Sequence, residues 1–232
     1  MPTALDQEVI AVLDRYAGAF PGDLREPLTA LYSLHARYRE RAGLSAPLTP
    51  ERYVVHFVLD SLKLLELGPP PSGATLADIG SGGGYPGLPL ALSRPDLAVT
   101  LVEPARRKAE YLRLATAALA LTNVTVEKGR GEAMSATFDV VTAKGVRPTP
   151  AFIAVMLARL RPGGRGVLWL GPGAERGAVA AAAAQAGAAV SWHDYRLPGY
   201  DGARTLAVIA GAPGATFHVK RSPRNYLFIN ML

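Results

Sequence analysis

The chain has 232 residues and a formal net charge of +6, from 25 lysines and arginines against 19 aspartates and glutamates. This length suffices for one α/β domain with an appendage and a complete hydrophobic core. The lack of cysteine excludes disulfides and thiolate metal ligands, and the four histidines show no zinc-ligand spacing, so we expect no metal. The positive charge suits a polyanionic partner, although many basic proteins bind no nucleic acid.

Hydrophobic residues make up 49% of the chain, yet no apolar run is long enough to span a bilayer. The alanine-rich segment 178–190 is interrupted by Gln185 and Gly187. The amino terminus has neither the basic start nor the apolar core of a signal peptide. We therefore expect a soluble, cytoplasmic protein that acts without a membrane.

Residues 1–72 are helical in pattern, and we expect them to form an extension packed on the main domain. Apolar residues recur at three- and four-residue spacings in 9–13 and 24–38. The second stripe ends in three arginines, which either contact phosphates or form a solvated helix end: Arg37, Arg39 and Arg41. A proline-rich stretch at 69–73 then predicts a stiff linker.

Thr49, Pro50 and Glu51 form a helix start, with a capping hydroxyl, a proline in the first turn and an acid. The helix that follows has a broad apolar face, so we expect it to pack against a sheet. His56 and Asp60 lie four residues apart in this helix. That spacing predicts a hydrogen-bonded pair with a structural role.

Strands and helices alternate from Thr75 onward, which predicts a main domain over 73–212. Apolar runs predict strands at 75–79, 99–102, 124–126, 138–143 and 166–170, the last after a turn at 161–164. Helical patterns occupy 88–92, 106–121, 150–160 and the alanine-rich segment, and the final runs at 190–197 and 205–210 predict a β-hairpin. The fold class is therefore α/β, with a doubly wound, mostly parallel, Rossmann-like sheet and an N-terminal helical extension.

Residues 213–232 form a basic and aromatic C-terminal tail. Such a tail can hold RNA through phosphate contacts and stacking. A frayed end and a last segment packed on the domain are the alternatives.

A glycine-rich loop lies between the first predicted strand of the sheet and the helix after it. Glycines lack a Cβ atom, so such a loop lets a ligand approach the backbone closely at the positive end of a helix. Gly82, Gly84 and Gly87 satisfy the G-x-G-x-x-G pattern of dinucleotide-binding folds. Asp78, Gly80, Gly82 and Gly84 equally satisfy the acidic-x-G-x-G-x-G pattern of S-adenosylmethionine methyltransferases.

Two acidic residues accompany this loop. Asp78 lies two residues before the first glycine, where a carboxylate suits the cationic sulfonium and amino group of S-adenosylmethionine and would repel a pyrophosphate. Glu103 ends the next predicted strand and can accept hydrogen bonds from ribose hydroxyls with either ligand. We therefore interpret the loop as an S-adenosylmethionine site; a glycine-rich structural turn without a ligand is the alternative.

Four segments together carry a more specific pattern: 56–62 (His-Phe-Val-Leu-Asp-Ser-Leu), 78–89 with a Pro-Gly pair after the glycines, 129–132 (Gly-Arg-Gly-Glu) and 139–146 (Asp-Val-Val-Thr-Ala-Lys-Gly-Val). In this pattern the chain resembles the bacterial 16S rRNA guanine-N7 methyltransferases, the glucose-inhibited division protein B family, over roughly residues 31–210. The first of these segments has one residue more than the corresponding helix of the family, which reads His-Phe-Leu-Asp-Ser-Leu. The family also carries arginine where Lys144 stands, so the charge is kept and the bidentate fork is lost.

The resemblance implies a seven-stranded methyltransferase sheet with S-adenosylmethionine as the cofactor. It also implies methylation of N7 of a guanine in 16S ribosomal RNA, with that RNA or the 30S subunit as the partner. We expect the protein to act as a monomer.

The residues agree with attack by a ring nitrogen. Guanine N7 has a free lone pair and no proton, so methyl transfer needs alignment rather than a general base. Residues 143–146 lack the Asn/Asp-Pro-Pro-aromatic box with which adenine-N6 and cytosine-N4 enzymes orient an exocyclic amine. The chain also lacks the cysteine nucleophile that C5 methylation of a pyrimidine normally needs.

Two cations are the expected catalytic residues. Lys144 lies at the carboxyl end of a predicted strand, where ligands bind in open α/β sheets. It can donate to guanine O6, or hold a phosphate or the cofactor's carboxylate. A solvated loop lysine is the alternative. Arg130 is the second cation.

The cofactor residues are expected from four parts of the sequence. Glu103 is assigned to the ribose hydroxyls and Asp78 to ordering the loop, while Gly131 and Glu132 are placed beside the adenine and Tyr85 beside the methionine arm. The full expected set is Asp78, Gly80, Ser81, Gly82, Gly84, Tyr85, Glu103, Gly131, Glu132 and Lys144.

Three other functions remain open. The same fold can methylate a small molecule or a protein, which methyl transfer to a metabolite without RNA binding would indicate. A non-catalytic RNA-binding relative would bind the cofactor without turnover. A dinucleotide-dependent dehydrogenase would bind NAD.

Overall fold

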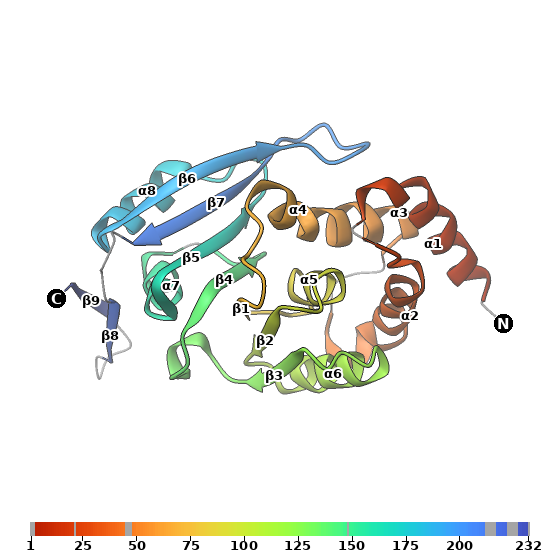
Figure 1. Ribbon diagram of the computed structural model, residues 1–232, viewed down its shortest axis with the longest axis horizontal. Helices are drawn as coiled ribbons and strands as arrows, with labels where there is room; N and C mark the ends of the chain where they lie inside the picture. Colours follow the sequence, from red (N-terminus) through yellow and green to blue (C-terminus); the bar gives the residue numbers. More distant parts are fainter. Residues whose placement is uncertain are drawn as a thin grey trace.

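The computed structural model describes residues 3–20, 22–44, 48–147, 149–211, 217–221 and 227–231. The chain begins with helices and then alternates strands and helices (Figure 1). The helices and strands, in order, are α1 Ala4–Arg15, η1 Ala17–Ala19, α2 Arg25–Ala42, α3 Pro50–Tyr53, η2 Val54–Leu59, α4 Asp60–Leu67, β1 Thr75–Ile79, α5 Gly87–Ser93, β2 Ala98–Glu103, α6 Arg106–Ala118, β3 Val124–Lys128, η3 Gly131–Ala133, β4 Phe138–Lys144, α7 Pro150–Ala158, β5 Leu160–Leu170, α8 Arg176–Gln185, β6 Ala188–Tyr195, β7 Arg204–Gly211, β8 Phe217–Arg221 and β9 Leu227–Met231.

The central sheet has seven strands in the order β3-β2-β1-β4-β5-β7-β6 (Figure 1). The first five strands of the chain pair in parallel, whereas β7 runs antiparallel to β5 and to β6. The strand order reverses at β1, between β2 and β4, where open α/β sheets bind their ligands. The predicted doubly wound, mostly parallel sheet with a terminal hairpin is confirmed.

Both faces of the sheet are covered, because parallel strands joined by crossover helices have apolar side chains on both sides. One core contains Leu76, Leu101 and Val167 with residues of α1, α2, α4, α5 and α6. The other core contains Ala77 and Leu168, which follow Leu76 and Val167 in their strands, together with residues of α7 and α8. Successive residues of a strand thus serve opposite cores, as the period of two requires.

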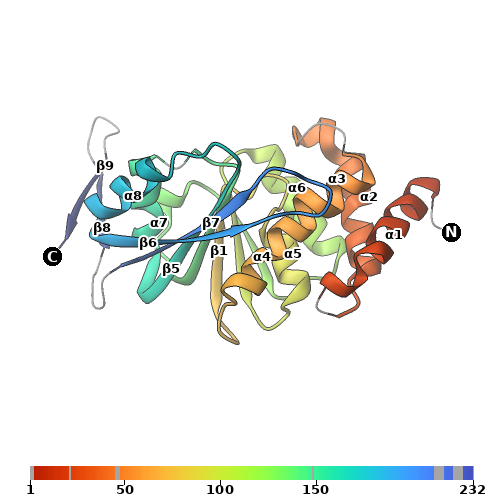
Figure 2. The same cartoon turned by 90° about the horizontal axis from the view of Figure 1, so that it is seen from above.

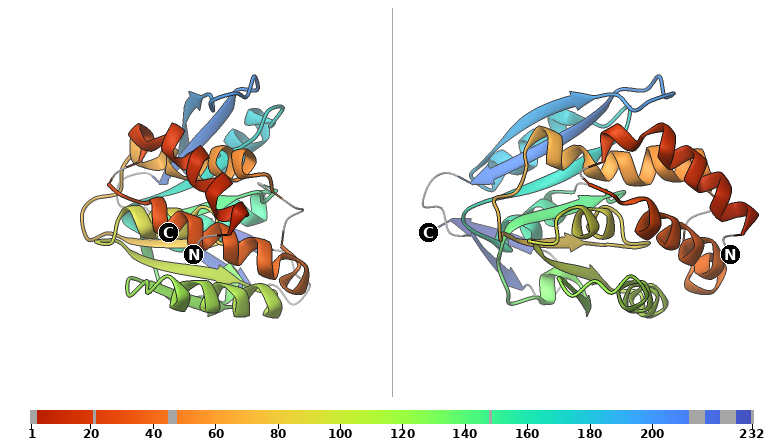
Figure 3. Two further views of the ribbon diagram at one scale, coloured as in Figure 1. Left: turned by 90° about the vertical axis from the view of Figure 1, so that its right-hand side faces the viewer. Right: turned by 45° about the vertical axis from the view of Figure 1, so that its right-hand side comes forward.

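The N-terminal helices gather at one end of the molecule and share the first core with the sheet (Figure 3). Helix α1 begins with a capping box between Thr3 and Asp6. Tyr53 is fully buried, and its hydroxyl donates to the carbonyl of Leu28, 2.8 Å away, which ties α3 to α2. The predicted boundaries of the main domain, after residue 72 and after residue 212, stay a prediction.

The predicted helix start at Thr49 is confirmed, since its hydroxyl accepts from the backbone N–H of Arg52. The six residues Val54–Leu59 then form a π-helix rather than an α-helix. A π-turn accommodates one more residue than an α-turn, and such turns are frequent at functional sites. This is the segment whose sequence has one residue more than the family pattern. The π-turn changes which residues share a face of the helix. The carboxylate of Asp60 makes its contacts with residues of the sheet.

Two boundaries differ from the sequence prediction. Helix α6 ends at Ala118 instead of Leu121, because Leu119 caps it and Ala120 has a positive φ of 50°. The predicted turn at 161–164 lies inside β5, where the register with β4 shifts from Phe138 opposite Leu160 to Val140 opposite Arg165. The turn is therefore an irregularity within one long strand.

The C-terminal tail contains a backbone hairpin, β8 paired antiparallel with β9, which lies beside α7. Residues 213–216, 222–226 and 232, which contribute to the predicted RNA-binding tail, lie outside the described residues. Binding of RNA by the tail stays a prediction.

The close approach of α5 to the sheet predicts that Gly87→Ala lowers the free energy of unfolding by about 1–3 kcal/mol. A Cβ atom there would lie 2.2 Å from Cδ2 of Leu101 and 3.0 Å from Oδ2 of Asp78, and both side chains are fully buried. Gly177→Ala in α8 is the control, because its Cβ would meet nothing within 4 Å. That variant should be neutral or stabilised by up to about 1 kcal/mol. Urea unfolding measures both; equal stabilities would contradict the prediction.

Candidate cofactor and substrate site

The glycine loop follows β1 and is bound to the ends of both β1 and β2. Gly80, Gly82 and Gly84 have positive φ angles of 80°, 55° and 94°, which side chains disfavour. The N–H of Gly80 donates to the carbonyl of Val102 at 2.8 Å. The hydroxyl of Ser81 donates to the carbonyl of Asp78 and accepts from the N–H of Val102. The loop is thus held in one conformation by the strands beneath it.

Asp78 lies under the loop and is fully buried. Its Oδ2 accepts from the N–H of Gly87, 3.1 Å away, and its Oδ1 accepts from the hydroxyl of Thr142, 3.2 Å away. Burial raises the pKa of Asp78 to about 7, because these donors and the more distant Lys144 offset only part of the desolvation penalty. Asp78 therefore joins β1 to the start of α5 beneath the loop, and its role in ordering a cofactor loop stays a prediction.

Glu103 ends β2 and is 5% exposed. Its Oε2 accepts from the N–H of Gly82 at 2.9 Å, and its Oε1 accepts from the N–H of Ala105 at 2.8 Å. An ionised carboxylate has about four lone-pair sites, so each oxygen can accept one further hydrogen bond. The carboxylate thus fixes the loop and still has acceptors for two hydroxyl groups.

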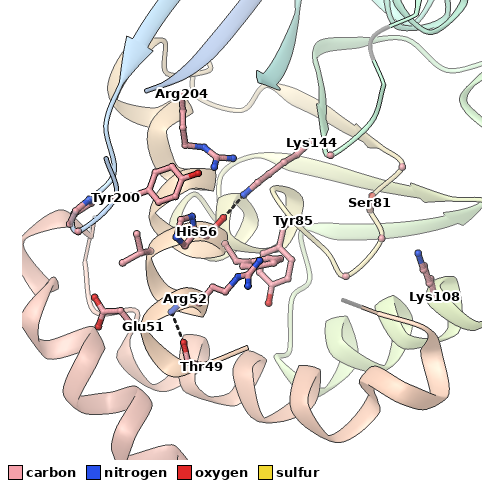
Figure 4. Close-up of a pocket in the computed structure, with 18 residues that line it drawn as sticks. Thr49, Glu51, Arg52, His56, Ser81, Tyr85, Lys108, Lys144, Tyr200 and Arg204 are labelled. Carbon is pink, nitrogen blue, oxygen red and sulfur yellow. Dashed lines mark hydrogen bonds between the residues drawn. The ribbon is translucent and has the colours of Figure 1, made fainter. Parts of the chain in front are cut away.

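A cavity of about 850 Å³ opens in front of the loop (Figure 4). Gly80, Ser81, Gly82, Gly83 and Tyr85 form one side of it. The opposite side comes from α3, η2 and the loop between β6 and β7, which reaches over the N-terminal helices (Figure 2). The charged and aromatic residues that line it are Glu51, Arg52, His56, Phe57, Tyr85, Lys108, Lys144, Tyr200 and Arg204.

Lys144 is the cavity residue whose side chain is most tightly held. Its Nζ lies 2.7 Å from Oδ2 of Asp60 and donates to the carbonyl oxygen of His56, also at 2.7 Å (Figure 4). The side chain is only 12% exposed. Burial lowers the pKa of Lys144 below its usual value, while the attraction of Asp60 opposes that shift. Lys144 is therefore a buried, ion-paired residue and not a solvated loop lysine.

An aromatic wall supports the loop from the side of the N-terminal helices. The ring of Tyr85 packs edge-on against Phe57 and Tyr53, at centroid distances of 4.9 and 6.3 Å. His35 packs beside Tyr85 at 6.0 Å. Burial, followed by the charge of Arg39, lowers the pKa of His35 to about 4, so the imidazole is neutral at pH 7. The wall is apolar and uncharged where it faces the glycines.

The sequence-predicted residues fall into two groups. Gly80, Ser81, Gly82, Tyr85 and Lys144 line the cavity, whereas Gly84 faces α5, where a Cβ would lie 2.3 Å from Cδ1 of Leu88; Glu103 binds the loop from behind. Gly131 is buried at η3, where a Cβ would lie 3.1 Å from Ile79, whereas Arg130 and Glu132 are exposed beside it. The structure does not bring Arg130 together with Lys144 in the cavity, and the roles assigned to the η3 residues stay predictions.

Sequence reasoning missed three contributors to the cavity. Arg52 and Tyr200 line it, and Arg204 both lines it and contacts Asp60, its Nε lying 3.0 Å from Oδ1. Tyr200 lies in the loop between β6 and β7 and Arg204 begins β7, so no spacing in the sequence links them to the glycine loop. The spacing of His56 and Asp60 was the available sequence signal for this side of the cavity. The structure shows that the carboxylate of Asp60 contacts residues of the sheet.

The residues present fit S-adenosylmethionine. The cavity volume lies within the range of roughly 300–1,000 Å³ that is usual for ligand sites. Backbone atoms free of Cβ groups face it at Gly80, Gly82 and Gly83. Glu103 can accept hydrogen bonds from ribose hydroxyls at the end of the second strand. The buried carboxyl of Asp78 beneath the loop suits a cationic ligand better than a pyrophosphate.

Solved structures share this fold. The chain superposes on an S-adenosylmethionine-dependent methyltransferase from Aquifex aeolicus with a TM-score of 0.55 and 18% identity, covering 69% of this chain and 93% of that one. It also superposes on the B. subtilis m1A22 tRNA methyltransferase TrmK with a TM-score of 0.53 and 17% identity, covering 68% and 67%. The chain therefore has the fold of S-adenosylmethionine-dependent methyltransferases.

Sequence comparison gives the family. The family described as rRNA small subunit methyltransferase G (GidB) matches residues 25–190. The protein of that name from Xanthomonas campestris pv. campestris is 36% identical over 217 residues, covering 89% of this chain and 97% of the relative. The one from Sorangium cellulosum is 47% identical over 142 residues, covering 59% of each chain. The chain belongs to the rRNA small subunit methyltransferase G family.

Two further observations concern metals and membranes. Within the described ranges, no group of three or more His, Asp and Glu side chains could hold a metal ion. No helix in that part of the chain is both long and apolar enough to cross a membrane.

The raised pKa of Asp78 predicts a pH-dependent stability that Asp78→Asn removes. Below about pH 4 the carboxyl is protonated in both states; between about pH 4 and 7 only the unfolded chain ionises, so the free energy of unfolding falls as the pH rises. The titration of one proton lowers the free energy of unfolding by at most about 1.4 kcal/mol for each pH unit. Urea unfolding of both proteins across this range should show a shallower decline for the variant. Parallel curves would mean that Asp78 does not titrate there.

Proposed function

We propose that the protein transfers the methyl group of S-adenosylmethionine to N7 of a guanine in 16S ribosomal RNA. Membership of the rRNA small subunit methyltransferase G family supports the RNA as substrate. The single structural observation that supports guanine is the cationic cavity in front of the glycine loop. Arg52, Lys108, Lys144 and Arg204 line it, against the one carboxylate of Glu51.

The acceptor groups of guanine match those cations. The major-groove edge of guanine presents N7 and O6, both acceptors, and arginine and lysine are their usual partners. N7 must keep its lone pair for attack, so a donor is needed at O6. Lys144 lies at the carboxyl end of β4 and its ammonium group reaches the carbonyl of His56 in η2, while Arg52 comes from α3. We assign the contact with O6 to Lys144 and contacts with flanking phosphates to Arg52 and Lys108.

The protein's own part in the reaction is alignment. S-adenosylmethionine supplies the electrophilic methyl group. Glu103 and the glycine loop hold one side of the site through the hydrogen bonds described above, and the rings of Phe57 and Tyr85 pack against each other beside the loop. Because N7 carries no proton, no side chain has to remove one; the rate then depends on holding the base in line with the methyl group.

Several finer assignments belong to this proposal. Asp78, Gly80, Ser81, Gly82, Gly84, Tyr85, Glu103, Gly131 and Glu132 form the cofactor site, with Lys144 and Arg130 as the catalytic cations. The substrate is naked 16S RNA or the 30S subunit, and the protein acts as a cytoplasmic monomer.

Tritiated methyl transfer to 16S RNA and to 30S particles that lack the modification tests this function. Borohydride–aniline cleavage of the product should then occur at a single 7-methylguanosine, and Lys144→Ala should slow its formation by about 100- to 1,000-fold. No incorporation, despite cofactor binding measured by calorimetry, would contradict the ribosomal substrate. Methyl transfer to a metabolite or protein instead would indicate the alternative methyltransferase.

Glu103→Ala should weaken cofactor binding by about 10- to 100-fold, because hydrogen bonds to a charged group are each worth about 1.5–3 kcal/mol. The variant also leaves the N–H groups of Gly82 and Ala105 without their acceptor. Glu127→Ala is the matched control: this carboxylate is exposed and lies on the neighbouring strand, paired with Val102. Calorimetry measures both affinities. Equal losses in the two variants would exclude Glu103 from the cofactor site.

A further inference from the structure

The carboxylate of Asp60 is fully buried where the N-terminal helices meet the carboxyl end of the sheet. It accepts from the hydroxyl of Tyr195 at 2.6 Å and lies 3.0 Å from Nε of Arg204 and 2.7 Å from Nζ of Lys144. The carbonyl of the same residue accepts from Nε1 of Trp169 at 2.7 Å. Partners on β4, β5, β6 and β7 therefore fix the position of one residue from the helical extension.

The contacts of Lys144 leave one of its donors for the cavity. An ammonium group has three N–H donors and no acceptor. One is used by the carbonyl of His56 and one by the ion pair with Asp60. The ring of Phe57 is also near, with Nζ 5.5 Å from its centroid. Since Lys144 lines the cavity, the remaining N–H is the donor that a ligand can meet.

The charge of Asp60 also matters for the reaction. Methylation at N7 places a positive charge on the guanine, which an uncompensated ammonium beside it would oppose. The single negative charge of Asp60 faces the positive charges of Lys144 and Arg204. The cluster therefore has one net positive charge instead of two, and it keeps the N–H donor.

We propose that Asp60 is a positioning residue, which aims the remaining N–H of Lys144 at O6 of the target guanine and lowers the positive charge at the methylated base. This inference rests on the proposed function. Asp60 itself has no exposed surface and so does not touch the substrate. Its effect on the reaction passes through Lys144.

A pH profile distinguishes this role from a structural one. Removal of the Asp60 charge withdraws the attraction that raises the pKa of Lys144, while burial and the charge of Arg204, which lower it, remain. The ammonium then loses its proton, and the enzyme its activity, at a lower pH than in the wild type. The ionisable groups that act on the Lys144 side chain are Asp60 of α4, His56 of η2, Asp78 of β1 and Arg204 of β7, and Tyr195 of β6 contacts the carboxylate of Asp60.

The experiment measures kcat and KM for methyl transfer to 30S particles lacking the modification, together with cofactor affinity by calorimetry. Asp60→Asn should lower kcat about a hundredfold, leave cofactor affinity unchanged and move the alkaline limb of the pH profile to lower pH. Asp60→Glu, which keeps the charge, should recover part of kcat. Asp139→Asn is the control: this carboxylate binds Arg161 at the opposite end of β4 and should leave kcat unchanged.

A second variant keeps the test decisive if Asp60→Asn fails to fold. Asp60→Asn/Lys144→Met removes both charges of the buried pair, and its kcat should equal that of Lys144→Met alone. A slower double variant, or Asp60→Asn with the kcat and alkaline limb of the wild type, would overturn the inference. Absence of methyl transfer by the wild type would instead contradict the proposed function, so the two failures are distinguishable.

Discussion

A glycine loop keeps one conformation when its backbone N–H groups find acceptors, and two buried carboxylates supply acceptors here in addition to the carbonyl of Val102. Asp78 binds the N–H of Gly87 where α5 begins, and Glu103 binds the N–H of Gly82 in the middle of the loop. Burying a carboxylate is costly, and charge-assisted hydrogen bonds offset that cost. The raised pKa of Asp78 shows that burial outweighs its donors. The shape of the cofactor side therefore depends on these two carboxylates.

The two sides of the cavity come from different parts of the fold. Strands β1 and β2 and the loop between β1 and α5 belong to the sheet that the chain shares with methyltransferases of very different sequence. The other side comes from α3, η2 and the β6–β7 loop. A shared fold does not determine a substrate, which depends on the residues placed around it. The distribution of cations on this second side is thus the part that carries specificity.

The cluster around Asp60 is better explained by function than by stability. Replacing a buried ion pair with apolar residues is often neutral or stabilising, whereas removing one partner costs about 3–5 kcal/mol. Stability alone would therefore not select a fully buried aspartate beside Lys144 and Arg204. The π-helix contributes to the same arrangement, because the carbonyl of His56 within it accepts from Lys144.

Local sequence patterns were enough to predict the sheet, the terminal hairpin and the cofactor loop. These patterns are apolar runs with a period of two or buried on both faces, helix caps such as Thr49, and glycines at fixed offsets from Asp78. The family was also readable from short segments. Glu103 could be assigned to the same site as the loop because the carboxyl ends of adjacent parallel strands must meet, but its hydrogen bond with the N–H of Gly82 was not predicted.

The surroundings of Lys144, in contrast, follow from tertiary packing alone. Asp60 and Arg204 are 144 residues apart, and their contact depends on where the helical extension packs on the sheet. No local pattern encodes that contact. The π-turn was not predicted either: the extra residue in segment 56–62 was visible, but the hydrophobic pattern of an apolar helix does not distinguish a π-turn from an α-turn. Burial then sets the charge states of Asp78 and Lys144, and burial is a property of the folded chain.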